Sequence, residues 1–171
     1  MTVHTGLAAD RHGVFRLGDI ESCTHEQIWE HLERVHGCRV AALSPMNAAN
    51  RANTPAFFVP DPWTPTPASG PPALHRLAGA LASAVRNHAS GECTLGTYAT
   101  VLVALGRYSL PRNGLATIGT LLRAVKQGPH RAILLDNLLA DVFLALTRRH
   151  RPDFASLFLN AGAHVQHHYL F

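Results

Sequence analysis

Three histidines, His164, His167 and His168, lie within five positions near the end of the sequence, and imidazole is the commonest side-chain ligand for metals. They come directly after the apolar run Phe154–Leu159, which has the length and composition of a buried strand. In open α/β sheets, ligands bind beyond the carboxyl ends of the strands. The cluster therefore predicts a site for a divalent transition metal, zinc first and manganese second.

The spacing of the cluster allows two of its side chains to converge. His164 and His168 are four residues apart, which places them on one face of a helix or on one side of an extended strand. His167 lies between them as a rival ligand. A catalytic zinc ion takes three protein ligands and a water, so a third donor has to come from another segment. The alternative interpretation is a solvated or hydrogen-bonded histidine cluster without a metal.

A second group of histidines lies near the start, in His4-Thr5-Gly6-Leu7 and His12-Gly13-Val14. This pattern predicts the end of a helix followed by a turn into a strand, and turn chemistry alone can explain it. A G-x-S-x-G elbow and a G-x-x-x-x-G-K-[ST] loop are both absent from the sequence, and we find no paired catalytic spacing among its carboxylates. We therefore assign no catalytic residue.

The elements around these residues alternate between helix and strand. Thr24-His25-Glu26-Gln27 fits a capping box, and the apolar residues after it recur at helical spacing up to Gly37. The short apolar run Arg39–Leu43 follows, ended by Ser44-Pro45. We expect this run and Phe154–Leu159 to form parallel strands that are adjacent or nearly so, because each follows an amphipathic helix.

The middle of the sequence predicts a proline-rich loop and a helical insertion. Residues 54–72 are rich in proline, so we expect an extended loop that packs on the body through Phe57, Phe58 and Trp63. Residues 73–150 are predicted to form a helical insertion. Within it, the pattern of Thr97–Tyr108 fits either a helix or a strand. The predicted helices are Leu74–His88, Arg112–Lys126 and Arg131–Arg149. The fold class is α/β, a single layered domain over residues 1–171 with parallel strands.

Composition excludes several classes of function. The formal net charge is +4, yet only 15% of the residues are charged, and the arginines are scattered without interleaved aromatics. Nucleic-acid binding is therefore not expected.

The three cysteines have no C-x-x-C spacing, which argues against a disulfide framework and a zinc finger. No signal peptide or membrane span is visible in the sequence, so we expect a cytoplasmic protein without membrane contact. Arginine in place of lysine, with abundant alanine, is typical of a GC-rich bacterial genome.

Three segments resemble the alkaline phosphatase superfamily, nearest its type I phosphodiesterase/nucleotide pyrophosphatase-like branch. Thr2-Val3-His4-Thr5-Gly6-Leu7 and His12-Gly13-Val14 resemble the T-G-L/x-P-x-x-H-G-I stretch that follows the Thr or Ser nucleophile of that family. Thr24–Leu43 matches the next helix-strand unit. Phe154–Tyr169 resembles a later strand and metal-ligand loop, where relatives carry Asp-x-x-x-His and then x-Tyr. The resemblance spans the chain, with a divergent middle.

The resemblance implies a function and a set of site residues. By spacing, His164 and His168 correspond to the metal-binding Asp and His of the family. The local His-x-Tyr match instead makes His167 the metal ligand. A neutral imidazole at His164 replaces an anionic ligand. The family hydrolyses phosphate or sulfate esters of small molecules with two metals. Its nucleophile and first metal-binding Asp would precede Thr2, and its remaining metal ligands would follow Phe171. The chain is thus expected to be an internal fragment of such a hydrolase, inactive alone.

The competing hypothesis is a non-catalytic α/β module. Two or three strands leave an open sheet edge, which has to be covered by something. Such a module would act through protein–protein interaction, including self-association through the exposed edge.

Overall fold

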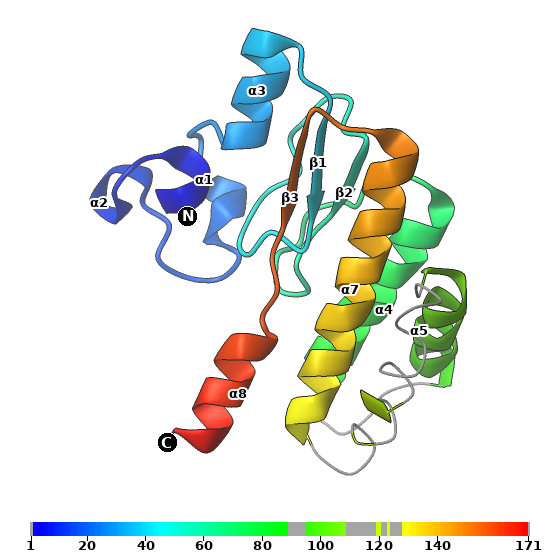
Figure 1. The fold of residues 1–171 in the computed structure, drawn as a ribbon. Helices are drawn as coiled ribbons and strands as arrows, with labels where there is room; N and C mark the ends of the chain where they lie inside the picture. The colour runs from blue at the N-terminus through cyan, green and yellow to red at the C-terminus, as the bar shows by residue number, and fades with distance from the viewer. Residues whose placement is uncertain (1, 89–94, 109–118, 121–122, 124–127, 171) are drawn as a thin grey trace.

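The computed structural model describes residues 2–88, 95–108, 119–120, 123 and 128–170 (Figure 1). Its core is a parallel three-stranded sheet with the order β2-β1-β3. The strands are β1 (Val40–Leu43), β2 (Phe57–Val59) and β3 (Phe154–Leu157). The helices are α1 (Thr2–Thr5), α2 (Ala9–His12), the 3-10 turn η1 (Asp19–Ser22), α3 (Ile28–His36), α4 (Pro72–His88), α5 (Leu95–Tyr108), α7 (Gly128–His150) and α8 (Ala161–Tyr169).

The predicted pairing of the two apolar runs is confirmed. β1 and β3 are adjacent and parallel, with Val40 opposite Phe154 and Leu43 opposite Leu157. All four residues of β1 are buried, as expected for a central strand covered on both faces, whereas all four residues of β3 are only partly buried. The α/β class with parallel strands is therefore observed, with β1 at the centre.

The prediction for the proline-rich segment is wrong in part. Phe57–Val59 is not loop but strand β2, paired parallel with β1. Phe57 and Phe58 are fully buried, as the packing prediction required, but Trp63 keeps 39% of its surface exposed. Prolines surround the strand without entering it, since Pro55 precedes it and Pro60 follows it. Their position explains how a short strand survives in this composition.

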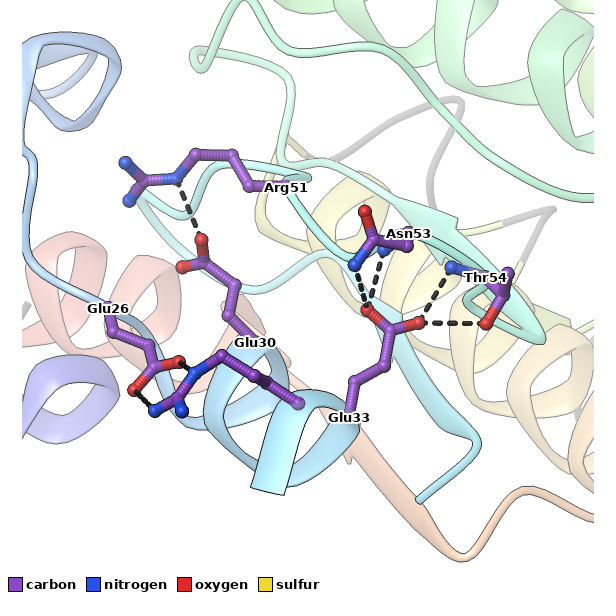
Figure 2. Close-up of a pocket in the computed structure, with 7 residues that line it drawn as sticks. Glu26, Glu30, Glu33, Arg51, Asn53 and Thr54 are labelled. Carbon is purple, nitrogen blue, oxygen red and sulfur yellow. Dashed lines mark hydrogen bonds and ion pairs between the residues drawn. The ribbon is translucent and has the colours of Figure 1, made fainter. Parts of the chain in front are cut away.

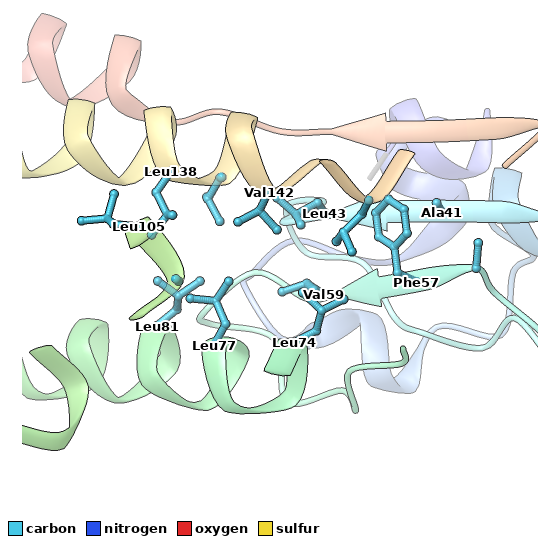
Figure 3. Packing of buried hydrophobic residues seen from close by; sticks show 14 residues of the cluster. Ala41, Leu43, Phe57, Val59, Leu74, Leu77, Leu81, Leu105, Leu138 and Val142 are labelled. Atoms are coloured by element: carbon cyan, nitrogen blue, oxygen red, sulfur yellow. The ribbon is translucent and has the colours of Figure 1, made fainter. Parts of the chain in front are cut away.

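One face of the sheet is covered by helices from the segment 73–150. The helix α4 contacts β2, and α7 contacts both β1 and β3. Figure 3 shows the side chains of these helices directed toward those of β1 and β2. The predicted helix Arg131–Arg149 is confirmed within α7, and its residues Leu138, Val142 and Leu146 are at most 3% exposed. The ambiguous segment before Tyr108 is the helix α5, and most of the predicted helix 112–126 lies outside the described residues.

The opposite face of the sheet packs against α3. Trp29 of α3 is fully buried with Val40, Ala42 and Phe58, and its ring meets that of Phe58 edge-on at 5.7 Å. The helix starts later than the Thr24 capping box predicts. Gln27 is the N-cap, and the Glu30 carboxylate accepts a hydrogen bond from its backbone N–H at 2.8 Å. Gly37 ends the helix in the left-handed conformation, as predicted.

The N-terminal segment differs from its prediction. No strand follows Gly13-Val14 in the described part of the chain; instead, Val14 packs with Ile20, Cys23 and Ala49 in a small separate cluster. Gly13 takes the left-handed conformation at the end of α2, so the expected turn is present. In the described ranges no helix is long and apolar enough to cross a membrane.

Candidate functional site at the carboxyl edge of the sheet

The three strands are parallel, so their carboxyl ends meet at one edge of the sheet. The loop Ser44–Asn47 follows β1, the turn Asp61–Thr64 follows β2, and α8 follows β3 after a short link. We call these three segments the carboxyl-edge site. The predicted histidines belong to the segment beyond β3, which Figure 1 shows leaving the lower end of the sheet.

The backbone at the histidine cluster is helical. His164, His167 and His168 all lie within α8, so positions 164 and 168 are one helical turn apart, which is the first of the two geometries that the spacing allows. The side chains of these three histidines lie outside the described residues. The first turn of α8 is fixed from α7, because the backbone N–H of Ala161 donates to the Asp136 carboxylate at 2.6 Å.

A buried carboxylate holds the neighbouring segments together. Asp61 is 2% exposed and accepts hydrogen bonds from the backbone N–H groups of Trp63 and Thr64 and from the Thr64 hydroxyl. It also accepts one from the backbone N–H of Asn47 at 2.6 Å. The turn after β2 and the loop after β1 are thus joined by one side chain.

The loop after β1 has an unusual backbone. Ser44 and Asn47 have φ values of 55° and 52°, in the left-handed region, and both are at most 9% exposed. Serine pays for this conformation with backbone strain of about 1 kcal/mol or more, and such strain persists only where surrounding contacts impose it. Here the contacts include the hydrogen bond from Ser44 N–H to the Val59 carbonyl at 2.7 Å.

The N-terminal segment reaches the same edge. His4 Nε2 is 3.0 Å from the carbonyl oxygen of Met46, in the loop after β1. The Asn47 side chain accepts from Gly18 N–H and donates to the Arg16 carbonyl, both at 2.9 Å. Burial lowers the pKa of His4, and the bond to Met46 opposes that effect only in part. His4 is therefore a neutral imidazole near pH 7.

His12 also has a fixed structural position. It is 6% exposed, and its Nδ1 accepts a hydrogen bond from Val14 N–H at 3.0 Å. That nitrogen is consequently engaged in the turn that the sequence predicts. The role of His12 Nδ1 is therefore explained by the turn, without a bound metal.

The charged pocket beside α3 has another role. Figure 2 shows this pocket of about 380 Å³, whose three glutamates each have a partner. Glu30 pairs with Arg51 at 3.2 Å, and Glu33 accepts hydrogen bonds from Asn53 and Thr54. Hydrogen bonds from Arg34 and then His31 lower the pKa of Glu26 to about 2. These contacts brace α3 against residues 51–54 and leave no carboxylate of the pocket unpaired.

No three histidine, cysteine or carboxylate side chains within the described ranges stand close enough to hold a metal ion. Sequence reasoning missed Asn47, Asp61 and Asp136, whose roles come from contacts with distant segments and leave no local motif. Searches of family models, curated proteins and solved structures found no match to the chain.

Proposed function

We propose that this chain supplies a metal half-site and part of the substrate wall of a metal-dependent phosphoester hydrolase, acting on small phosphodiesters or sulfate esters. The observation that carries the proposal is the position of α8. This histidine-bearing helix follows β3 after a link of three residues and packs against α7, beyond the carboxyl edge of the sheet, where α/β proteins bind ligands.

A second observation supports the same proposal. The first and the last of the segments that resemble the alkaline phosphatase superfamily are more than a hundred residues apart in the sequence. The first contacts the loop after β1 through His4 and Met46, and the last follows β3, the strand next to β1. Each of these two segments therefore contacts or follows the carboxyl end of one of two neighbouring strands, which supports the proposal.

The donor set of α8 suits zinc. Imidazoles one helical turn apart can ligate one ion, and neutral imidazole is a ligand that zinc accepts readily. A bound zinc ion supplies Lewis-acid stabilisation of charge on a transferring phosphoryl or sulfuryl group. Two carboxylates of this chain hold the segments involved: Asp136 fixes the start of α8, and Asp61 joins the turn after β2 to the loop after β1.

Metal binding is tested by calorimetric titration with zinc. We expect weak binding by the native chain, loss of most of it in His164→Ala and in His168→Ala, and its retention in His167→Ala. If His168→Ala kept zinc binding and His167→Ala lost it, His167 would be the ligand in place of His168. Equal binding by all four proteins would contradict the half-site. Binding should also weaken below pH ~6.5, because protons compete for the imidazole nitrogens.

Catalysis is tested separately. The resemblance assigns the nucleophile and the remaining metal ligands to positions outside residues 1–171, so we expect no hydrolysis of an aryl phosphodiester by this chain with zinc or manganese. Turnover above a metal-only blank would show that residues of this chain replace them.

A further inference from the structure

The two outer edges of the sheet differ in whether their backbone groups are paired. The outer edge of β2 is covered, because Phe58 and Ser69 exchange two hydrogen bonds of 2.8 and 2.7 Å across an antiparallel bridge. β3 is the outer strand on the other side (Figure 1), and no strand of the described residues pairs with its free edge. Its four residues are also only partly buried.

The alternation of the backbone shows which amides are free at this edge. Phe158 N–H donates to the Leu43 carbonyl at 3.1 Å, so Phe158 directs its amide toward β1. Successive residues of a strand direct their amides to opposite sides. Ser156 therefore also faces β1, whereas the N–H and C=O groups of Ala155 and Leu157 face outward.

Apart from its short length of four residues, this edge lacks the usual protection. Natural edge strands are kept short or are guarded by lysine, proline, bulges or inward charges. Residues 154–159, Phe-Ala-Ser-Leu-Phe-Leu, contain no charge and no proline, and Leu159 is 46% exposed. The side chains of this edge therefore do not prevent its outward N–H and C=O groups from pairing with another strand.

We propose that β3 pairs antiparallel with β3 of a second copy of this chain, across a two-fold axis at Ser156. In this register Ala155 lies opposite the partner's Leu157, and the two residues exchange both of their outward hydrogen bonds. Phe154 lies opposite the partner's Phe158, an aromatic cross-strand pair.

The register is self-complementary. Residues directly opposite each other share a face of the sheet: Ala155 and Leu157 already pack with the cluster under α7, and Phe154 packs on the α3 side. Asp153 falls opposite the partner's Leu159, so no like charges meet. The small Ser156 sits at the axis, where it meets its own copy. The result joins two three-stranded sheets into one.

The first test is the mass in solution, measured by light scattering over a dilution series. We expect twice the 18.5 kDa mass of the chain for the native protein and a single chain mass for Ala155→Pro. This proline removes an outward N–H and leaves the β1–β3 hydrogen bonds intact. The matched control Ala155→Gly keeps the N–H and should remain a dimer. A native protein of single mass, or a dimer unaffected by Ala155→Pro, would overturn the proposal.

A second variant keeps the test valid if the proline variant does not fold. Ser156→Cys brings two thiols together at the axis, in a pair whose backbone groups do not bond across it and whose Cα atoms are close enough for a disulfide. Mild oxidation should give a covalent dimer in high yield. Ser22→Cys, on the exposed turn η1, should not cross-link above the background of the native cysteines. Equal cross-linking of the two variants would count against the interface. The outcome is independent of zinc binding by α8.

Discussion

The β2 side and the β3 side of this small sheet are built in different ways. On the β2 side the strand is buried, its outer edge is covered, and a buried carboxylate ties the turn after it to the loop after β1. On the β3 side the strand is only partly buried, no strand among the described residues pairs with its outer edge, and the helix after it carries three histidines. The β2 side thus fixes the geometry of the sheet, whereas the β3 side carries the proposed metal ligands and the proposed contact surface.

The largest effect should come from the core of the β2 side. Phe57→Ala empties a fully buried site between β1, α4 and α7, so we expect a loss of about 4 kcal/mol in the free energy of unfolding. Urea denaturation measures it. Trp63→Ala, a few residues away, removes a half-exposed ring and should cost less than about 1 kcal/mol. Equal losses of unfolding free energy in the two variants would contradict the distinction between the buried strand β2 and the turn that follows it.

The next effect should come from the buried carboxylate. Asp61→Ala leaves the N–H groups of Asn47, Trp63 and Thr64 without their acceptor, so we expect a loss of about 3 kcal/mol in urea denaturation. Faster hydrogen exchange should appear in both segments that Asp61 joins. Exchange confined to residues 61–64 would mean that the loop after β1 is held by other contacts.

A smaller effect is expected on the β3 side. Asp136→Ala removes the single acceptor that fixes Ala161, so the cost should be about 1 kcal/mol and should be local to α8. Circular dichroism and amide exchange of α8 would detect it, with Asp10→Ala on the exposed helix α2 as the control. Global destabilisation as large as that of Asp61→Ala would contradict the division between the sides.

The smallest effect concerns pH. Because burial lowers the pKa of His4 below its unfolded value near 6.5, the folded state binds protons less readily than the unfolded state. The native protein should therefore be at full stability above pH 6.5 and should lose some of it as the pH falls through the lowered folded pKa. His4→Gln should reduce that slope. An unchanged slope would assign the acid sensitivity to other groups.

The sequence predicts the pairing of β1 with β3 well because both strands have local sequence patterns that indicate them. Arg39–Leu43 and Phe154–Leu159 are short apolar runs preceded by amphipathic helices, and their ladder is parallel as expected. β2 is missed because three residues between prolines give too short a pattern. The start of α3 is misplaced because Gln27 gains its N-cap role from tertiary contacts, including a hydrogen bond from its side chain to the Ala49 carbonyl at 3.0 Å.

The candidate site divides in the same way. The histidines of α8 are visible in the sequence because a cluster of one residue type after a strand is a local signal. Asn47, Asp61 and Asp136 leave no such signal, since the partners of Asn47 and Asp136 are 14 to 31 residues away along the chain. Local spacing therefore predicts donors, whereas the side chains that position them need the fold.

The most direct test of the metal half-site is X-ray absorption spectroscopy of the zinc-loaded chain. The account predicts nitrogen ligands at about 2.0 Å with the multiple-scattering signature of imidazole. It also predicts that this signature is lost when His164 and His168 are both replaced by alanine. A zinc spectrum without imidazole, or one unchanged by the double substitution, would contradict it.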